Sequence, residues 1–355
     1  MEIPTPIQPP SPTPTPTATL LPRPPGLPVA VLDVDINPDD NKIIYVVAKG
    51  DGIYKTMDGG YRWQRINAFP NVESLTLGLA NPQTVFAAAD RLVLKSTDGG
   101  ANWQSPIEIK DPHTGQPLKG AVHVLAVVPG DDQIIYVGTD EGVYRSEDGG
   151  VNWELRMRGM GGRPIYALVV ASDDGQLVYA AGRGGELWRT FDGGNFWDQL
   201  PCGAMEAIYT LALLPASGYE KDWLYIGADN STVAVSVDGG RNWRPIILGE
   251  EKPLYLRAPL KISSVTILDF RDSETVLLAA TGDRENLFRN GIYKSTDGGL
   301  SWWPRNNGLP TDPSGTAYSV HSIAVDPQNN QIVYAGTFAG LYKSTDGGES
   351  WTRIP

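Results

Sequence analysis

The chain has 355 residues, of which 41% are hydrophobic and 20% charged, and its formal net charge is −12. This acidic balance disfavours non-specific binding to nucleic acid or to anionic membranes, because both attract an excess of Lys and Arg. No stretch approaches the about 18 consecutive apolar residues that cross a bilayer, so no membrane insertion is expected. Cys202 is the single cysteine, which excludes an internal disulfide and a cysteine-based metal cage.

Residues 1–28 are rich in Pro and Thr and almost free of charge, as in "PTPIQPPSPTPTPTATLLPRPPGLP". Such a segment cannot bury a core, so it is predicted to be a disordered, extended, polyproline-like linker. It resembles the linkers that hold bacterial extracellular domains away from an anchor or signal segment. We therefore expect an extracellular or cell-surface location with that segment removed, and a cytoplasmic protein with a disordered N-terminus is the alternative.

Residues 29–355 repeat one motif, [S/T]-x-D-G-G-x-x-W, seven times at spacings of 40 to 59 residues. Such a spacing favours a β-propeller in which each repeat forms one blade. The aspartates are Asp58, Asp98, Asp148, Asp192, Asp238, Asp297 and Asp346, and the tryptophans are Trp63, Trp103, Trp153, Trp197, Trp243, Trp302 and Trp351.

Each motif lies within the same pattern of short strands and tight turns. The last repeat reads "HSIAVDP", "QIVYAGT", "GLYKSTDGG" and "WTRIP", which predicts four antiparallel strands. The Asp-Gly-Gly sequence permits the positive φ of a tight turn, and the Ser/Thr hydroxyl and Asp carboxylate can accept hydrogen bonds from its N–H groups. The Trp is expected to fill the wedge between neighbouring sheets. The predicted fold is therefore an all-β, seven-bladed propeller of four-stranded antiparallel blades.

This motif resembles the Asp box, or BNR repeat, of sialidases, xyloglucanase-type glycoside hydrolases, sortilin-type receptors and Ycf48/HCF136-type photosystem II assembly factors. Seven boxes in one chain of this length most resemble the Ycf48 type. That resemblance implies a non-catalytic platform that engages a protein partner through an Arg-bearing face. The sialidase-like and xyloglucanase-like families imply the alternative, a glycoside hydrolase or a glycan-binding lectin.

The phase of the repeats predicts how the ring closes. The chain enters on an innermost strand near Val31 and ends on an outermost strand at Trp351–Pro355, so each blade is complete within its own repeat. We expect blade 1 to pack against blade 7 without a shared strand, and a linker segment can add to that edge. No sequence motif indicates an oligomeric state, and a monomer is expected.

Loops that enter innermost strands and loops between second and third strands should share one face, which we call the loop face. Three long loops are predicted there, at residues 104–121, 248–262 and 304–318, and "TGDRENLFRNG" lengthens blade 6. Guanidinium groups pair with carboxylates of a partner protein or an anionic glycan. The candidate binding residues are Arg156, Arg158, Arg163, Arg183, Arg257, Arg284, Arg289 and Arg305, and the alternative is that they are solvated loop charges.

Asp33 and Asp35 are the sharpest candidates for catalysis, because they share one face of a predicted innermost strand about 6.5–7 Å apart. Inverting glycosidases separate their carboxylates by about 6.5–9.5 Å. Asp269 is a possible third carboxylate. The alternative is that these residues line a wet channel or bond to neighbouring backbone.

Other chemistry does not fit the sequence. "DVDINPDDN" has Pro38 where a calcium loop needs Gly, and no metal or cofactor is predicted. His113, His123 and His321 are expected in loop or core positions. A sialidase would need an Arg-Ile-Pro signature near the start of its domain, whereas here that tripeptide is Arg353–Pro355.

Overall fold

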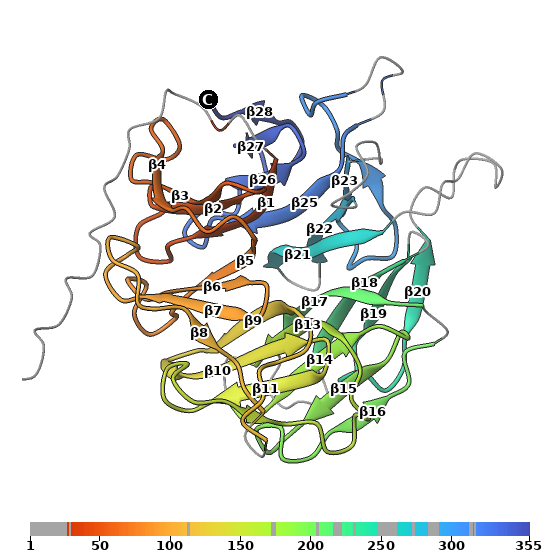
Figure 1. Cartoon of the computed structure of the whole chain (residues 1–355). Helices are drawn as coiled ribbons and strands as arrows, with labels where there is room; N and C mark the ends of the chain where they lie inside the picture. Colours follow the sequence, from red (N-terminus) through yellow and green to blue (C-terminus); the bar gives the residue numbers. More distant parts are fainter. Residues whose placement is uncertain are drawn as a thin grey trace, which may run out of the picture.

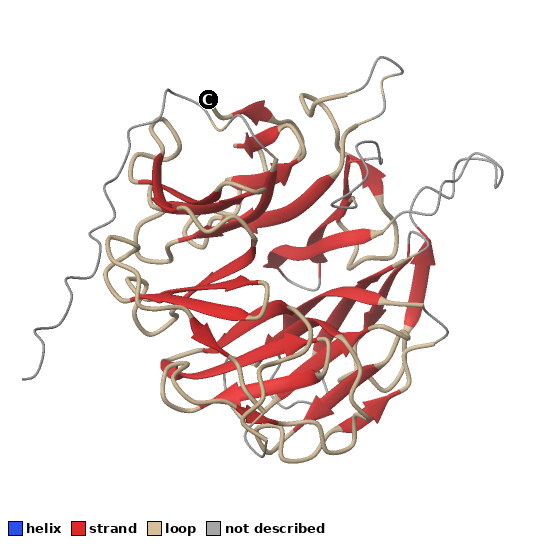
Figure 2. Cartoon of the chain, viewed as in Figure 1, coloured by secondary structure: helices blue, strands red, loops and turns tan. Residues whose placement is uncertain are grey.

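The computed structural model describes residues 27, 30–111, 114–171, 175–203, 206–215, 222–229, 232–247, 261–271, 274–282, 291–311, 315 and 317–355. The predicted linker, apart from Leu27, and the blade 6 insertion lie outside the described residues. In the described part the regular elements are β-strands without any helix, so no helix there is long and apolar enough to cross a membrane (Figure 2).

The strands form seven four-stranded antiparallel sheets arranged as a ring (Figure 1). Blades 1 and 2 contain β1 (Val31–Ile36), β2 (Ile44–Ala48), β3 (Gly52–Thr56), β4 (Gln64–Asn67), β5 (Val72–Leu77), β6 (Val85–Ala89), β7 (Leu92–Ser96) and β8 (Ile107–Glu108). Blades 3 and 4 contain β9 (Val122–Val128), β10 (Asp131–Thr139), β11 (Gly142–Ser146), β12 (Glu154–Leu155), β13 (Ile165–Val170), β14 (Val178–Gly182), β15 (Leu187–Thr190) and β16 (Asp198–Leu200). Blades 5 and 6 contain β17 (Ile208–Leu214), β18 (Trp223–Ala228), β19 (Thr232–Ser236), β20 (Arg244–Ile247), β21 (Ile262–Arg271), β22 (Glu274–Thr281), β23 (Gly291–Ser295) and β24 (Trp303–Pro304). Blade 7 contains β25 (Val320–Val325), β26 (Val333–Thr337), β27 (Gly340–Ser344) and β28 (Thr352–Arg353).

This architecture confirms the predicted seven-bladed propeller. Each sheet uses four consecutive strands, so the ring closes by packing of β1 against β25 and β26 and not by a shared strand. At this closing seam Asn41 donates a hydrogen bond to Asp326 at 2.9 Å, and Gln328 donates to the carbonyl of Pro38 at 3.1 Å. Leu27 is 1% exposed and packs into the same core.

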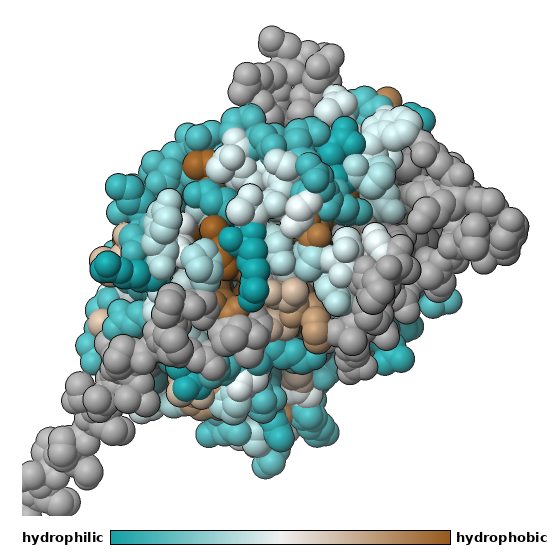
Figure 3. Space-filling model, turned by 90° about the horizontal axis from the view of Figure 1, so that it is seen from above, coloured by the Kyte–Doolittle hydropathy of each residue, from teal (hydrophilic) through white to brown (hydrophobic). Residues whose placement is uncertain are grey.

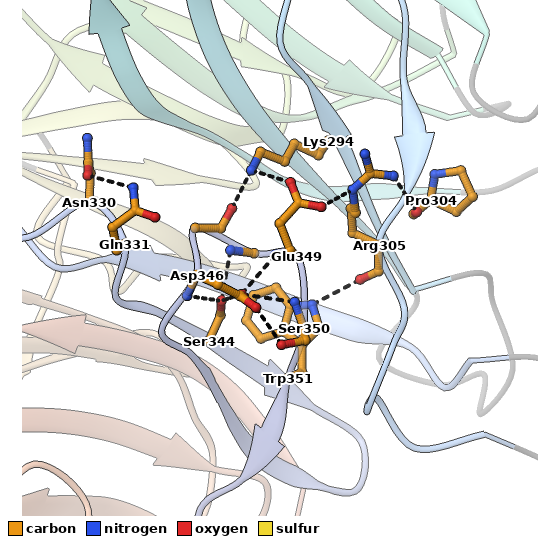
Figure 4. Close-up of polar contacts among 12 residues, drawn as sticks. Lys294, Pro304, Arg305, Asn330, Gln331, Ser344, Asp346, Glu349, Ser350 and Trp351 are labelled. Atoms are coloured by element: carbon orange, nitrogen blue, oxygen red, sulfur yellow. Dashed lines mark hydrogen bonds and ion pairs between the residues drawn. The ribbon is translucent and has the colours of Figure 1, made fainter.

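The Asp box of blade 7 shows how the repeated motif fixes a turn (Figure 4). The Ser344 hydroxyl donates to the Asp346 carboxylate at 2.7 Å and accepts from the N–H of Gly348 at 2.8 Å. Asp346 also accepts the N–H groups of Glu349 and Ser350. Burial of this carboxylate favours its neutral form, but the hydrogen bonds outweigh that effect and lower the pKa of Asp346 to about 2.

The other six boxes repeat this geometry. Their Ser or Thr hydroxyls donate to the box aspartates at 2.8–2.9 Å. Both glycines of every box have positive φ, for example 67° at Gly347 and 84° at Gly348, where a side chain would be strained. The motif therefore acts as the expected structural fastener.

The box tryptophans hold neighbouring blades together. Each of the seven core clusters lies between two neighbouring blades and contains or contacts the Trp of the later blade. The Trp197 indole donates to the carbonyl of Arg156 at 3.0 Å, and the Trp351 indole donates to the carbonyl of Arg305 at 2.9 Å. The indoles thus fill the wedges between sheets, as the sequence predicts.

A second fastener crosses four of the seams. A basic side chain on the third strand donates to the carbonyl of the first box glycine in the next blade. These bonds are Lys55 to Gly99 at 2.9 Å, Lys95 to Gly149 at 2.7 Å, Arg189 to Gly239 at 2.9 Å and Lys294 to Gly347 at 2.8 Å. Blade 5 has Val235 at this position, which has no donor.

Replacing Lys95 by Met should lower the free energy of unfolding by about 1–2 kcal/mol, because it removes a charged donor from a partly buried carbonyl. The matched control is Lys110→Met, which removes an exposed lysine with only a 3.7 Å contact to Glu108. Urea denaturation measures both. Equal stabilities for the two variants would contradict a fastening role for Lys95.

Candidate functional site

The innermost strands carry an irregularity at the same point of every blade. One residue near the start of each strand is skipped in the pairing with the second strand, which is a β-bulge. Bulges redirect side chains and concentrate beside binding sites. The skipped residues are Leu32, Glu73, His123, Tyr166, Tyr209, Ser263 and His321.

All seven skipped residues line one hollow of about 800 Å³ at the loop-face end of the central channel, which we call the mouth. Lys49, Asp90 and Lys261, from turns and loops on the same face, also line it. The repeats are otherwise alike, but the residue type at this position differs between blades. The fold therefore does not determine which side chain stands there.

A chain of contacts runs along the mouth through blades 3 to 6. His123 contacts the Asp140 carboxylate through Nε2 at 2.8 Å, and its ring meets Tyr166 edge to face with centroids 4.9 Å apart. Tyr166 stacks on Tyr209 at 5.6 Å, and the Lys261 ammonium lies 3.8 Å from the centroid of the Tyr209 ring. This sequence of contacts fixes the side chains, so the mouth is preorganised.

Asp140 anchors that chain of contacts. Burial raises the pKa of its carboxyl group. The hydrogen bonds from the N–H of Ala121 and from the His123 ring lower that pKa by more, so the net pKa is below the ordinary value. The Ala121 N–H donates at 2.8 Å. Asp140 is therefore an acceptor that orients His123.

Asp33 and Asp35 lie on innermost strand β1 beyond its bulge, where they bond to backbone. Asp33 accepts the N–H of Leu75 at 3.0 Å, and Asp35 accepts the N–H of Leu77 at 3.0 Å. The Ser322 hydroxyl of blade 7 also donates to Asp33 at 3.0 Å. The free edge of an innermost strand leaves N–H groups unpaired, and these two carboxylates satisfy two of them. This is the alternative that the sequence left open for them.

The structure separates the candidate arginines instead of gathering them on one face. The Arg156 guanidinium bonds to Asn195, and Arg158 lies 6.0 Å from the Phe196 ring, so both contact the Asp-box turn of blade 4. Arg305 pairs with Glu349 of the blade 7 turn at 2.6 Å (Figure 4). The placement of these three arginines on the loop face was therefore wrong: Arg156 and Arg305, three positions after a box Trp, lie against the box turn of the next blade, and Arg158 lies near the same turn as Arg156.

Arg163 and Arg183 do lie together on the loop face. They line a hollow of about 640 Å³ with Gly161, Gly184 and Glu206. Arg163 also pairs with Glu186 at 3.1 Å. Arg257, Arg284, Arg289, His113, Tyr255 and the side chain of Asp269 lie outside the described residues.

Sequence reasoning missed the mouth itself. It placed His123 and His321 in loop or core positions, whereas both line the hollow. Each skipped residue directly follows the Val or Ile that opens its innermost strand, but this order of residues does not by itself reveal a bulge. The aromatic residues Trp303 and Tyr318 do not line the mouth: Trp303 is 49% exposed on outermost strand β24, and Tyr318 packs beside Phe338.

Within the described residues no cluster of three or more His, Cys, Asp or Glu side chains could hold a metal ion. The mouth combines bases, acids and phenol hydroxyls, which suits hydrogen bonding to a polar ligand. The surface in Figure 3 is mostly hydrophilic, and its hydrophobic residues form only small patches.

Comparison with known proteins agrees with this fold. The family described as photosynthesis system II assembly factor YCF48 matches residues 25–165, which span blades 1 to 3. No curated protein matches the chain. The chain is thus an Asp-box propeller that resembles YCF48 in its first three blades.

Several solved structures share the fold. The GH74 xyloglucanase from Xanthomonas campestris matches with a TM-score of 0.72 and 17% identity, over 95% of this chain and 56% of that chain. The GH74 enzyme from Niastella koreensis matches with a TM-score of 0.69 and 19% identity, over 94% of this chain and 55% of that chain. This chain thus spans just over half the length of those two enzymes. YCF48 from Cyanidioschyzon merolae matches with a TM-score of 0.61 and 18% identity, over 92% of this chain and 97% of that chain.

The structure of YCF48 bound to a D1 peptide matches with a TM-score of 0.63 and 17% identity, over 92% of this chain and 95% of that chain. All these identities are low enough that the matches show the fold alone.

Asp35 should make stability depend on pH. Burial, followed by the negative charge of Asp33, raises the pKa of Asp35 to about 7, although N–H bonds oppose the shift. A raised folded-state pKa contributes stability that is complete below the ordinary value of about 3.9 and is lost as pH rises towards 7. Relative to Asp35→Asn, the natural protein should therefore lose stability between about pH 5 and pH 8.

Urea denaturation of both proteins at the two pH values measures this difference. Asn at position 35 keeps an oxygen that can accept the N–H of Leu77, so the variant should fold. If the free energy of unfolding changed equally with pH in the two proteins, the raised pKa of Asp35 would be contradicted.

Proposed function

We propose that the protein is a non-catalytic binding platform that engages a polypeptide through the mouth of its channel. The observation that carries this proposal is the β-bulge in every blade, which brings seven side chains of five different types to one hollow. The fold of the ring needs no such variety there, whereas recognition of a partner does. The comparison with YCF48 bound to a D1 peptide supports a protein partner for this chain.

The aromatic side chains of the mouth suit a polypeptide better than a sugar. Sugars stack on exposed ring faces, but Tyr209 has Tyr166 on its blade 4 side and Lys261 on its blade 6 side. The Tyr209 ring thus already has two partners within the protein. The tyrosine edges and hydroxyls remain to meet a ligand, and these donate and accept hydrogen bonds as peptide groups do.

A glycoside hydrolase of the GH74 type, or a lectin, is the second candidate, favoured by the high structural similarity to two GH74 enzymes. Against catalysis, Asp33 and Asp35 lie on one strand and accept backbone hydrogen bonds, instead of facing each other across a cleft. We also assign to the docking surface the separate hollow on the loop face that Arg163 and Arg183 line. A location outside the cell, on a Pro/Thr linker, remains part of the proposal.

Selection of random peptides of about 12 residues on the purified protein tests the proposal. Selected peptides should lose about tenfold or more in affinity for Tyr209→Ala and for His123→Ala, because both substitutions break the contacts that shape the mouth. Leu300→Ala is the matched control, since it removes an exposed hydrophobic side chain from an Asp-box turn.

The enzyme alternative is tested in parallel with a panel of β-glucans and sialosides. No sugar release is expected. Sugar release that disappears in Asp33→Asn, or peptide affinities that are the same in the mouth variants and in Leu300→Ala, would overturn the proposal.

A further inference from the structure

The mouth does not end at the channel rim. A second hollow of about 530 Å³ lies over the seam between blades 2 and 3 and is lined by Asp90, Arg91, Leu92, Glu108, Lys119, Gly120 and Ala121. Asp90 lines both hollows, so it stands at their junction. Together the two hollows form an elongated depression.

Asp90 is held at this junction in an unusual conformation. It has φ of 53°, the one positive φ of a non-glycine residue among the described residues. Residues other than glycine adopt such φ values rarely, and at a cost. Its carbonyl accepts the N–H of Val122 across the seam at 2.7 Å, and its carboxylate accepts the Asn71 amide at 2.9 Å. The carboxylate is therefore fixed in position before any ligand arrives.

Asp140 connects the walls of the two hollows. One of its oxygens accepts the N–H of Ala121 in the second hollow, and the other contacts His123 in the mouth. A Cβ atom on Gly120 would lie only 2.2 Å from the Asp140 carboxylate, so glycine permits this close approach. The elongated depression is thus one supported structure and not two unrelated gaps.

The charges of the mouth are separated by blade. Blade 2 supplies its two acids, Glu73 and Asp90, while its bases Lys49, His123, Lys261 and His321 come from other blades. In the second hollow blade 2 supplies both Arg91 and Glu108. A basic side chain of a ligand would therefore find its complement on the blade 2 side.

The geometry points to a groove that runs from the mouth past Asp90 and across the seam between blades 2 and 3, and that binds an extended polypeptide with a basic side chain at Asp90. An extended chain advances about 3.3 Å per residue, so it can occupy both hollows, which a compact ligand would not. This inference rests on the proposed function and adds the path and the charge of the bound segment.

Two substitutions test the role of Asp90 without disturbing its turn. Asp90→Gly removes the side chain but accepts positive φ freely, and Asp90→Asn keeps the size and hydrogen-bonding oxygen while removing the charge. Asp131→Asn is the control, because it removes the same charge from the exposed first residue of β10, which lines neither hollow. Thermal unfolding verifies that all variants fold.

The probes are a lysine-containing peptide selected on the natural protein and the same peptide with Lys→Met at each position in turn. One Lys→Met change should weaken binding about tenfold for the natural protein and for Asp131→Asn, but not for Asp90→Asn or Asp90→Gly, which should already bind about tenfold more weakly. Lys119→Glu, at the outer part of the groove, should change the affinity of the full peptide but not that of a fragment of about four residues that fills the mouth.

Other results overturn the inference in distinguishable ways. If Tyr209→Ala abolishes peptide binding while the Asp90 and Lys119 variants bind every peptide normally, the groove is wrong and the proposed function stands. If selected peptides lack basic residues, the charge assigned to the partner is wrong. If no peptide binds the natural protein, the proposed function and the groove fail together.

Discussion

The hydrogen bonds of the Asp box are the constraint on which the rest of the structure depends. A carboxylate, a hydroxyl and two glycines with positive φ fix each turn between third and fourth strands. That turn sets the direction of the strand that carries the Trp, and the indole then fills the seam to the previous blade. These repeated contacts do not involve the skipped residue near the start of each innermost strand, so that residue can vary while the buried Val or Ile before it does not.

Function is proposed at this variable position. The skipped residue of each bulge belongs to no strand pair, and of the seven only Leu32 is part of a seam core, so neither dictates the identity of the other six. Equivalent positions of the seven blades can be compared directly. Where the other blades fold without a given side chain, the fold alone does not explain its presence in one blade. By the same comparison Asp33 and Asp35 occupy positions where neighbouring blades have Ser, Thr or Ala, and their hydrogen bonds supply a structural explanation.

Much of the fold was predictable, because the Asp-box residues lie in local turns with a fixed spacing. The number of blades, the four strands per blade and the closing packing of blade 1 on blade 7 follow from that spacing. The mouth was not predicted, because a β-bulge is defined by the register between two strands and no residue type in the sequence identifies it. The arginines show a related limit: Arg156 and Arg305 follow short strands, so loop positions were expected, but both reach the next blade. Arg163 and Arg183, which follow turns with several glycines, lie on the loop face.

The central claim is that the bulged ends of the innermost strands bind the partner while the Asp boxes only hold the ring together. Hydrogen–deuterium exchange of the protein, alone and with a selected peptide, tests this division most directly. The account predicts slower exchange on binding at the amides around Glu73, His123, Tyr166 and Tyr209, and unchanged exchange at the seven box turns. Protection confined to the box turns, with the mouth unaffected, would contradict it.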